Sequence, residues 1–366
     1  MSLEKYLLMV KFVYLDRHWQ NIKQQYLKEL NDMWSKGNVV YQSESVERVI
    51  CEHTHRKHSI LVNSCTDAIT LMLQASKIKK GSEVLCPAYS FFATASAISR
   101  AGLTPVFVDV DKNYHIDLKK AKHLITSKTT GLIFVSLFGN PMNYSEVMSF
   151  CIDNDIECFE DAAQSFGSID INKIPSGKPG LCSALSFSPS KPSPAFAFCG
   201  AVCTDDDSVA ERVRSIRYHA KGTNMQGHNT NVPSAIALQL YHSLKFSTIT
   251  QARRHEIAKE YDKKLSQLDS KIKLPPRNNI HNWSKYVIQT NRRDELLKHL
   301  TKNNIDTKIH YDTIIPHEQV YTKNHHVVYP TALKLTKTSL SLPIDSWLET
   351  KEQKEVIDTI KDFYNE

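Results

Sequence analysis

The stretch SILVNSCTDAITLMLQA, residues 59–75, decides the fold of this chain. It opens with a short β-rich run, and an apolar helical pattern follows the polar residues Asn63, Ser64, Thr66 and Asp67. A strand followed by a helix is the repeating unit of parallel sheets that are covered by helices. The free N–H groups at such a helix start favour a phosphate, and an ordinary N-cap explains the same polar residues. The stretch therefore predicts a βα unit and leaves both explanations open for its polar residues.

The alternation of strand-like and helical patterns continues through the following 140 or so residues, as expected of repeated βα units. Seven runs have the composition of strands: SILV (59–62), EVLC (83–86), PVFVDV (105–110), GLIFVS (131–136), IECFE (156–160), ALSFS (184–188) and GAVCT (200–204). Amphipathic stretches lie between these runs, and a long helical region covers roughly 233–268. The pattern predicts an α/β fold of three layers, in which a mostly parallel seven-stranded sheet lies between helices.

The pattern changes near LPPRNN (274–279), which indicates a second unit. We expect a strand at YVIQT (286–290), a helix at RRDELLKHLTKNN (292–304), a strand at TKIHY (307–311) and a last helix opened by a capping box from Thr350 to Gln353. The chain is thus predicted to form a large domain over 1–250, on which segment 1–57 packs, and a smaller α+β domain over 251–366.

The composition is that of a globular protein with a mild cationic excess. The 366 residues carry a formal net charge of +7, and no block of like charges indicates a nucleic-acid-binding arm. The eight cysteines form no CxxC pair, so we expect reduced core residues in place of disulfides, zinc ligands or any other metal site. No run approaches the roughly 18 apolar residues of a membrane span, and YLLMV (6–10) is too short for a signal peptide. We therefore expect a cytoplasmic protein that binds neither nucleic acid nor membranes.

Polar and aromatic residues follow several of the predicted strands, at the sheet edge where ligands collect. Tyr89, Phe91 and Phe92 follow one strand, and Asp161 follows another directly. Aromatic residues at this edge pack in a core or face a flat ring, and a carboxylate there caps a turn or pairs with a buried cation. Lys191 lies in ALSFSPSKPSPAFAFCGAV (184–202), a stretch of small and apolar residues with no other basic side chain.

Together these residues describe a pocket for pyridoxal phosphate. The helix start would hold an anion, an aromatic ring would face the flat ring, Asp161 would face a positive ring nitrogen, and Lys191 would reach an aldehyde. An apolar setting and a neighbouring cation lower the pKa of a lysine, which leaves a free amine able to form a Schiff base.

The chain resembles the sugar-nucleotide aminotransferases, the DegT and StrS relatives within the fold-type I pyridoxal-phosphate enzymes. The resemblance covers nearly the whole chain, and its most specific pair is EDAAQSFG followed by the lysine of SPSK, 30 residues after Asp161. The matching blocks are VKFVYLDRHWQNI, NSCTDAI, PAYSFFATASAI, GLTPVFVDVD, VSLFGNP, EDAAQSFGS, SFSPSKP, GHNTN, KIHYDTIIPHEQVY and SLSLP.

The resemblance implies roles for four residues around the cofactor ring. Lys191 would bond the cofactor and later shuttle a proton between substrate and cofactor. Asp161 would keep the ring nitrogen protonated, Gln164 would contact the ring hydroxyl, and Phe91 would stack on the ring.

The resemblance also implies a phosphate site and a homodimer. Cys65, Thr66 and Ser186 would hold the phosphate. Asn229 of GHNTN would reach across from the partner subunit, so that the two subunits share their active sites. The residues implied near the sugar nucleotide are His219, His310 and Tyr311.

The implied reaction moves an amino group, from glutamate, onto a keto group at C3 or C4 of a nucleotide-linked deoxysugar, with pyridoxamine phosphate between the two halves. The product would be an amino sugar for a surface polysaccharide, such as lipopolysaccharide O-antigen, or for another glycosylated product. Two alternatives stay open. A sugar-nucleotide dehydratase would lack Lys191, and a regulatory homologue would bind a nucleotide sugar without turnover.

Three positions and the stretch after Lys191 depart from the family pattern. The family usually has glycine where Cys65 stands, arginine where Asn231 stands and glutamine where Ile236 stands, and only Gly200 remains of the glycines expected after the lysine. The loss of the arginine speaks against recognition of an acidic sugar at that position.

Overall fold

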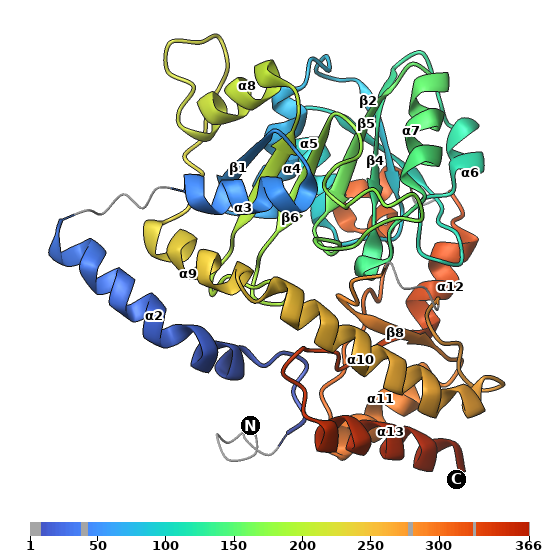
Figure 1. Cartoon of the computed structure of the whole chain (residues 1–366). Coiled ribbons are helices and arrows are strands. Elements are labelled where there is room, and N and C mark those ends of the chain that lie inside the picture. Colours follow the sequence, from blue (N-terminus) through green and yellow to red (C-terminus); the bar gives the residue numbers. More distant parts are fainter. Residues whose placement is uncertain (1–8, 38–42, 277–280, 325–326, 366) are drawn as a thin grey trace.

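The computed structural model describes residues 9–37, 43–276, 281–324 and 327–365 (Figure 1). Its centre is a seven-stranded sheet in the order β1-β7-β6-β5-β4-β2-β3, in which β7 runs antiparallel to both neighbours and the other pairs are parallel. The strands are β1 His58–Val62, β2 Glu83–Pro87, β3 Thr104–Val108, β4 Thr129–Val135, β5 Glu157–Ala162, β6 Cys182–Ser186 and β7 Gly200–Thr204. All seven predicted strands are therefore confirmed.

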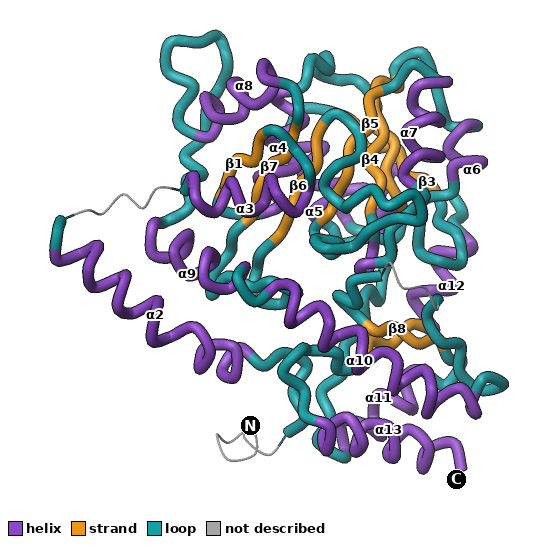
Figure 2. The backbone as a smooth tube through the Cα atoms, in the orientation of Figure 1, coloured by secondary structure: helices purple, strands orange, loops and turns teal. Residues whose placement is uncertain are grey.

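Helices cover both faces of this sheet (Figure 2). One face carries α4 Cys65–Ala75, α5 Ala93–Arg100 and α8 Asp207–Arg217, and the other carries α3 Glu44–Thr54, α6 Leu118–Lys122, α7 Tyr144–Asp153 and α9 Ser234–Leu244. Successive side chains of a strand point to opposite faces. Accordingly, Ile60 and Val62 belong to the core under α4, while Leu61 belongs to the core under α3 and α9. The predicted three-layer α/β architecture is confirmed.

The C-terminal part has a hydrophobic cluster of its own. Its elements are α10 Ser247–Leu265, η2 Ser266–Leu268, β8 Tyr286–Gln289, α11 Arg293–Lys302, β9 Ser339–Leu342 and α13 Thr350–Asn365, and β8 pairs antiparallel with β9. Helix α12 Pro330–Thr338 packs against the core of the large sheet instead, through Ala332 and Leu335. The short turns η1 Leu137–Gly139, η3 Ile315–His317 and η4 Gln319–Asn324 complete the described elements.

Two local predictions in this part are wrong. TKIHY is not a strand, because its contact with β9 is a single bridge between Lys308 and Ser341, after which the chain turns toward the large sheet. The predicted capping box is also absent. The side chain of Glu352 accepts the N–H of Glu349, which precedes the helix, and Gln353 donates to the carbonyl of Ile257 instead.

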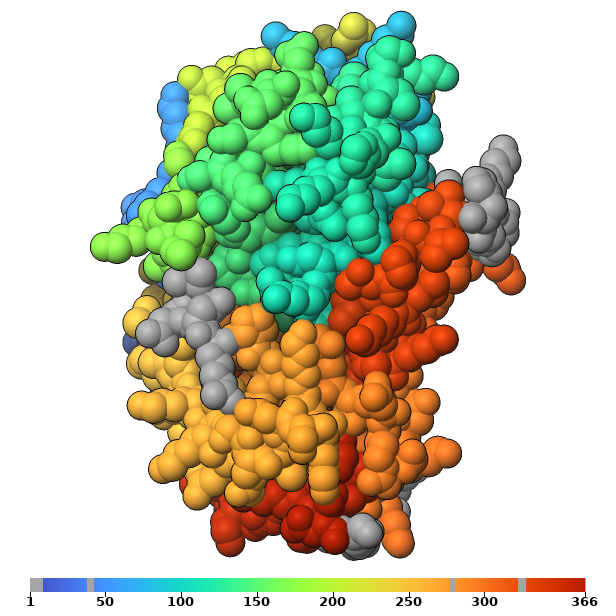
Figure 3. Space-filling view, turned by 90° about the vertical axis from the view of Figure 1, so that its right-hand side faces the viewer, coloured from blue at the N-terminus to red at the C-terminus, as the bar shows by residue number. Residues whose placement is uncertain are grey.

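The N-terminal segment contacts both parts of the chain. Val10 and Tyr14 belong to the C-terminal hydrophobic cluster, while α2 Leu15–Ser35 lies along α9. Helix α10 crosses the predicted boundary at residue 250. Gln251 donates to the carbonyl of Gly167, and Ile257 and the residues after it join the C-terminal cluster. In Figure 3 the green and cyan residues of the large sheet region rest directly on the orange and red C-terminal residues. The proposed division at 250 therefore stays a prediction, and residues 1–8 lie outside the described residues.

In the described part of the chain, every helix is too short or too polar to cross a lipid bilayer.

Candidate active site

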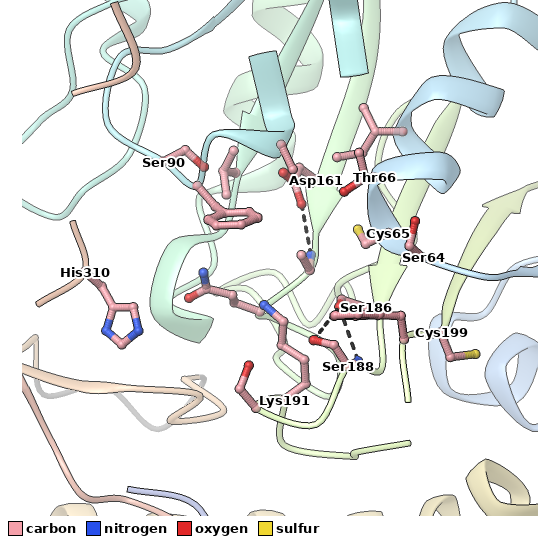
Figure 4. Close-up of a pocket in the computed structure, with 18 of the residues that line it drawn as sticks. Ser64, Cys65, Thr66, Ser90, Asp161, Ser186, Ser188, Lys191, Cys199 and His310 are labelled. Carbon is pink, nitrogen blue, oxygen red and sulfur yellow. Dashed lines mark hydrogen bonds between the residues drawn. The ribbon is translucent and has the colours of Figure 1, made fainter. Parts of the chain in front are cut away.

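A cavity of about 310 Å³ lies at the carboxyl ends of β1, β5 and β6 and beside the loop after β2 (Figure 4). The structure brings nine of the eleven residues predicted for the site to this cavity: Cys65, Thr66, Phe91, Asp161, Gln164, Ser186, Lys191, His310 and Tyr311. They come from segments that are far apart in the sequence. The site therefore lies at the carboxyl ends of the strands, which is where open parallel sheets bind their ligands.

Lys191 follows β6 in a short turn, in which its N–H donates to the carbonyl of Ser188 at 2.9 Å. Its side chain points into the cavity, toward the side where Asp161 lies (Figure 4). Burial lowers the pKa of Lys191, and the nearby Cys65 and Asp161 oppose that shift in part. The lower pKa favours the uncharged amine, which is the nucleophilic form.

Asp161 is the last but one residue of β5 and is 4% exposed. One carboxylate oxygen accepts the Thr94 hydroxyl at 2.7 Å, and the other accepts the N–H of Ala163 at 3.1 Å. Burial raises the pKa of Asp161, whereas these two hydrogen bonds and the Lys191 amine lower it. The carboxylate is thus held in one orientation and lacks a close cation among the described residues, so a positive group in the cavity would complete its environment.

The start of α4 forms the other wall of the cavity. Ser64 is the N-cap, and its hydroxyl accepts the N–H of Asp67 at 3.1 Å, so the ordinary cap is present. The cap leaves the N–H groups of Cys65 and Thr66 without a protein acceptor in the described part of the chain. Ser186 lies opposite this helix start (Figure 4). Free N–H groups and the helix dipole favour an anion here.

Gly200 sets the distance between β7 and the start of α4. A Cβ at this position would lie 2.6 Å from the backbone nitrogen of Cys65 and 2.6 Å from the carbonyl carbon of Ser64. Such contacts involve backbone atoms that have no side-chain freedom to move away. The close approach of β7 therefore requires glycine at this position.

Hydrogen bonds fix the residues at the far end of the cavity. The Gln164 amide donates to the Tyr311 hydroxyl at 3.1 Å and accepts the N–H of Phe138 at 3.0 Å. The Tyr89 hydroxyl donates to the carbonyl of His310 at 2.5 Å and accepts the N–H of Tyr311 at 2.9 Å. Burial, with the nearby lysines, lowers the pKa of His310 to about 3, so its ring is neutral near pH 7.

Two of the predicted residues do not line this cavity. Asn229 and His219 are exposed in the loop after α8, which projects from the body of the molecule in Figure 1. The amide of Asn231 donates to the Asn229 side chain at 3.4 Å, while Ile236 packs against the core under α3 and α9. The predicted contacts of Asn229 with the cofactor and of His219 with the substrate remain predictions.

Two residues of the site were missed by the sequence analysis. Thr94, on α5, holds Asp161, and Lys285, just before β8, lines the cavity beside Lys191. The signal for Lys285 was available in the run WSKYVI, where a single lysine stands among residues of a buried strand. It is the same kind of signal that singled out Lys191.

Comparison with known proteins agrees with this geometry. A pleiotropic regulatory protein of Geobacillus stearothermophilus is 29% identical over 365 residues, which is 96% of this chain and 97% of the relative. A UDP-2-acetamido-2-deoxy-3-oxo-D-glucuronate aminotransferase of Pseudomonas aeruginosa is 27% identical over 353 residues, with 94% of this chain and 98% of the relative covered.

One solved structure is similar to this chain over nearly the whole length of both. DesV of S. venezuelae, determined in complex with a ketimine intermediate, matches with a TM-score of 0.93 at 27% identity and covers 98% of this chain and 99% of that chain. The DegT/DnrJ/EryC1/StrS aminotransferase family matches residues 20–361. These findings confirm the resemblance and the fold class that the sequence predicted, and this chain belongs to the DegT/DnrJ/EryC1/StrS aminotransferase family.

Proposed function

We propose that the cavity binds pyridoxal 5'-phosphate and that the enzyme moves an amino group from glutamate to a keto group, at C3 or C4, of a nucleotide-linked deoxysugar. The observation that carries this proposal is the presence of the Lys191 amine and the Asp161 carboxylate in one cavity at the edge of the sheet. This arrangement meets the two chemical needs of the cofactor, a primary amine for its aldehyde and an anion for its ring nitrogen.

The other residues of the cavity fit the remaining groups of the cofactor. The open N–H groups of Cys65 and Thr66, together with Ser186, would hold the phosphate. Phe91 is 57% exposed, so one face of its ring is free to cover the flat heterocycle. Gln164, fixed by Tyr311 and Phe138, would face the ring hydroxyl.

When bound, pyridoxal phosphate supplies an aldehyde that condenses with amines and a ring that accepts an electron pair from the adjacent carbon. Burial lowers the pKa of Lys191 and so favours the uncharged amine, whose Nζ would take a proton from the substrate carbon and return it. Its attachment after a short turn holds the lysine at one edge of the cavity.

Asp161 acts from the opposite end of the cavity. Its buried carboxylate would keep the ring nitrogen protonated, because an ion pair offsets the cost of burying either charge alone. Thr94 and the N–H of Ala163 orient the carboxylate and favour its charged form.

The substrate class rests on the relatives. The Pseudomonas aeruginosa relative is named for a keto-sugar nucleotide, and another relative, from Aneurinibacillus thermoaerophilus, is named a dTDP-3-amino-3,6-dideoxy-alpha-D-galactopyranose transaminase. His310 and Tyr311 line the cavity where such a sugar would lie. We place the enzyme in the cytoplasm, in the synthesis of amino sugars for a surface polysaccharide or another glycosylated product.

The proposal includes a homodimer with shared active sites. Asn229 and His219 are exposed on the projecting loop after α8, which suits side chains that reach the cavity of the partner subunit. Asn229 would then complete the phosphate site from outside, and His219 would approach the sugar.

The test is a two-stage measurement on the purified holoenzyme. Glutamate alone should bleach the visible absorption band of the bound cofactor and release 2-oxoglutarate, and one of a panel of UDP-, dTDP- and GDP-linked 3-keto and 4-keto sugars should restore the band. Release of water from the sugar in place of amination would favour a dehydratase. A chain that binds sugar nucleotides but leaves the band unchanged with glutamate would favour the regulatory alternative.

A further inference from the structure

A short segment just before β8, residues 282–285, contacts three loops beside the cavity. These loops follow β4, β5 and β6, which are neighbours in the sheet. The segment reaches them through Asn282 and Lys285, which are 1% and 6% exposed. Its N–H groups donate there to backbone carbonyls, those of Phe138, Gly139, Gln164, Phe166 and Ser190.

Asn282 holds the loop that carries Gln164. Its amide donates to the carbonyl of Gln164 at 3.0 Å and to that of Phe166 at 2.9 Å, which uses both hydrogens of the amide. Its Oδ1 accepts the N–H of Ser284 at 2.8 Å, so all of these bonds would be lost if the amide turned over. The backbone of Gln164 is therefore fixed from the side of the C-terminal part.

Gly139 lets Asn282 come this close to the loop after β4. The N–H of Asn282 donates to the carbonyl of Gly139 at 3.1 Å, and the N–H of Lys285 donates to that of Phe138 at 3.2 Å. Gly139 has a φ of +88°, and a Cβ on it would overlap Oδ1 of Asn282. The contact therefore requires glycine at this position.

Lys285 holds the turn that carries Lys191. Its Nζ donates at 3.0 Å to the carbonyl of Ser190, the residue directly before Lys191. The same turn is closed by the bond from the Lys191 N–H to the carbonyl of Ser188 at 2.9 Å. The backbone on which Lys191 stands is thus held both from within the turn and from the 282–285 segment.

The bond from Lys285 does not depend on a charge. Among the described residues, no carboxylate lies within 4.0 Å of its amine. Burial, with Lys191 and Arg254, places the pKa of Lys285 well below the usual value for lysine, and Asp345 opposes that shift. An uncharged amine still has N–H donors, so it can hold the carbonyl of Ser190 without the cost of a buried charge.

Packing alone does not account for these two side chains. Burying an amide or an amine costs free energy unless it forms hydrogen bonds, whereas leucine or methionine would fill similar space without that cost. The side-chain N–H groups of Asn282 and Lys285 reach two loops of the site, one with Gln164 and the other with Lys191. The polar groups therefore connect the C-terminal part to the site itself.

We propose that the 282–285 segment sets the position of Gln164 relative to Lys191, with Asn282 as the positioning residue for Gln164 and Lys285 as that for Lys191. The inference rests on the proposed function, which places the ring hydroxyl of the cofactor at Gln164 and its aldehyde at Lys191. These two groups stand on adjacent carbons of the ring, so a shift of either loop separates a side chain from its group.

The two positioning residues should differ in which form of the cofactor they affect. Gln164 would face the ring hydroxyl, which pyridoxal phosphate and pyridoxamine phosphate both carry. Lys191 bonds only the aldehyde, and pyridoxamine phosphate has an amine in its place. A displaced Gln164 therefore weakens both forms, whereas a displaced Lys191 weakens pyridoxal phosphate alone.

The test strips the full chain of cofactor and measures its dissociation constants for both forms by equilibrium dialysis. Lys285→Met keeps the length of the side chain and removes the donor. It should weaken pyridoxal phosphate about threefold to tenfold and leave pyridoxamine phosphate within twofold of the wild type. Asn282→Asp keeps the shape, removes both donors and should weaken both forms about tenfold.

Ser284→Ala is the matched control in the same segment. Ser284 is 1% exposed, and its hydroxyl has no hydrogen-bond partner in the described part of the chain. Its loss should leave the binding of both forms within twofold of the wild type. Equal weakening of both forms by Ser284→Ala and Lys285→Met would show a general disturbance of the segment and overturn the proposal.

Asn282→Ala covers the case in which Asn282→Asp fails to fold. It leaves room for water to reach the two carbonyls, so it should fold and still weaken both forms about threefold or more. If both variants of Asn282 bind the two forms as tightly as the wild type, Asn282 does not position Gln164. If Lys285→Met changes neither form, or weakens both equally, Lys285 does not position Lys191.

These outcomes are separate from those that test the proposed function. A wild type that binds neither form would overturn the proposed function itself. A wild type that binds both forms and is bleached by glutamate, while the variants bind as tightly, would overturn the positioning role and leave the amino transfer standing.

Discussion

Thr94 donates its hydroxyl hydrogen to the Asp161 carboxylate at 2.7 Å, although the two residues stand 67 positions apart in the chain. The bond joins the first turn of α5 to the end of β5. It favours the charged carboxylate that burial disfavours.

Thr94→Val removes this donor and keeps the shape of the side chain. A hydrogen bond to a charged group is worth about 1.5–3 kcal/mol, so cofactor affinity should fall about 10- to 100-fold and the pKa of Asp161 should rise. Titration of the apoenzyme with pyridoxal phosphate at several pH values measures both effects. Thr94→Ser keeps the hydroxyl and should remain within a few-fold of the wild type; equal losses in both variants would refute the role of the hydroxyl.

Lys191→Ala removes the amine that we expect to bond the cofactor and carry the proton. The rate of amino transfer should fall at least about 100-fold, because the proton at the substrate carbon loses its acceptor. Borohydride should fix the cofactor to a peptide that contains Lys191 in the wild type and to no peptide in the variant, as mass spectrometry would show. Covalent labelling that persists in Lys191→Ala would contradict the assignment.

Gly200→Ala tests the close approach of β7 to the start of α4. The added methyl group would meet backbone atoms at 2.6 Å, so the helix start must move. Overpacking of this kind costs about 1–3 kcal/mol of unfolding free energy, and the displaced N–H groups should weaken phosphate binding. Urea denaturation and the cofactor dissociation constant measure the two effects. Gly131→Ala is the control, because this glycine also lies in a strand without a positive φ and its methyl group would meet side-chain atoms of Ile78 and Phe159 at 3.2 and 3.3 Å, which can shift.

Asn229 provides a test of the shared active site. Lys191→Ala and Asn229→Ala should each be nearly inactive as homodimers. Mixing the unfolded variants and refolding them together should restore about a quarter of the wild-type activity, because half of the dimers are mixed and each of these has one intact site. Activity that stays at the level of the separate variants would show that Asn229 acts within its own subunit or not at all.

His281 predicts a dependence of stability on pH. Its ring is 2% exposed and stacks on Trp283 at 4.1 Å, and burial lowers its pKa from 6.5 to about 3. Between pH 6.5 and 3 the unfolded chain therefore binds a proton at His281 that the folded chain does not bind. This group alone lowers the unfolding free energy by about 1.4 kcal/mol per pH unit as the pH drops through this window.

His281→Gln should remove that slope. Urea denaturation at pH 7, 6 and 5 gives the unfolding free energy of both proteins. Carboxylates with raised pKa values, such as Glu160, have the opposite effect on stability, but both proteins contain them, so they cancel when the variant is subtracted from the wild type. Asp205, whose pKa is lowered to about 2, contributes only below about pH 3.8. Parallel curves for the two proteins would show that His281 is not the source.

The sequence predicted the strands of the large sheet because burial on both faces leaves a distinct apolar run for each one. It did not predict their order. The place of β7 between β1 and β6 depends on contacts such as Gly200 against Cys65, which join residues far apart in the chain. The TKIHY strand failed for a similar reason, since its residues leave β9 after one bridge to supply His310 and Tyr311 to the cavity.

The residues of the candidate site divide in the same way, into those that the sequence pattern marks and those that only tertiary packing brings to the cavity. Asp161, which directly follows a predicted strand, was found because the end of a parallel strand is a known place for a ligand. Lys191, just after another strand, stood out as the one basic side chain of an apolar stretch. Thr94 reaches the site through packing of a helix, and no local pattern marks that packing. Lys285 stands out locally as the lone lysine of WSKYVI, but that pattern does not show that packing of the C-terminal part brings it to this cavity.

The N–H of Val10 donates to the carbonyl of Asn304 at 3.0 Å, and Arg17 forms a salt bridge with Glu352 at 2.7 Å. Residues of the N-terminal segment thus find their partners far later in the chain. During synthesis on the ribosome, Val10 and Arg17 must wait until Asn304 and Glu352 have emerged before they can form these contacts. A stalled or prematurely ended translation product would therefore expose Val10 and Tyr14 to chaperones and proteases, even if its large sheet had already formed.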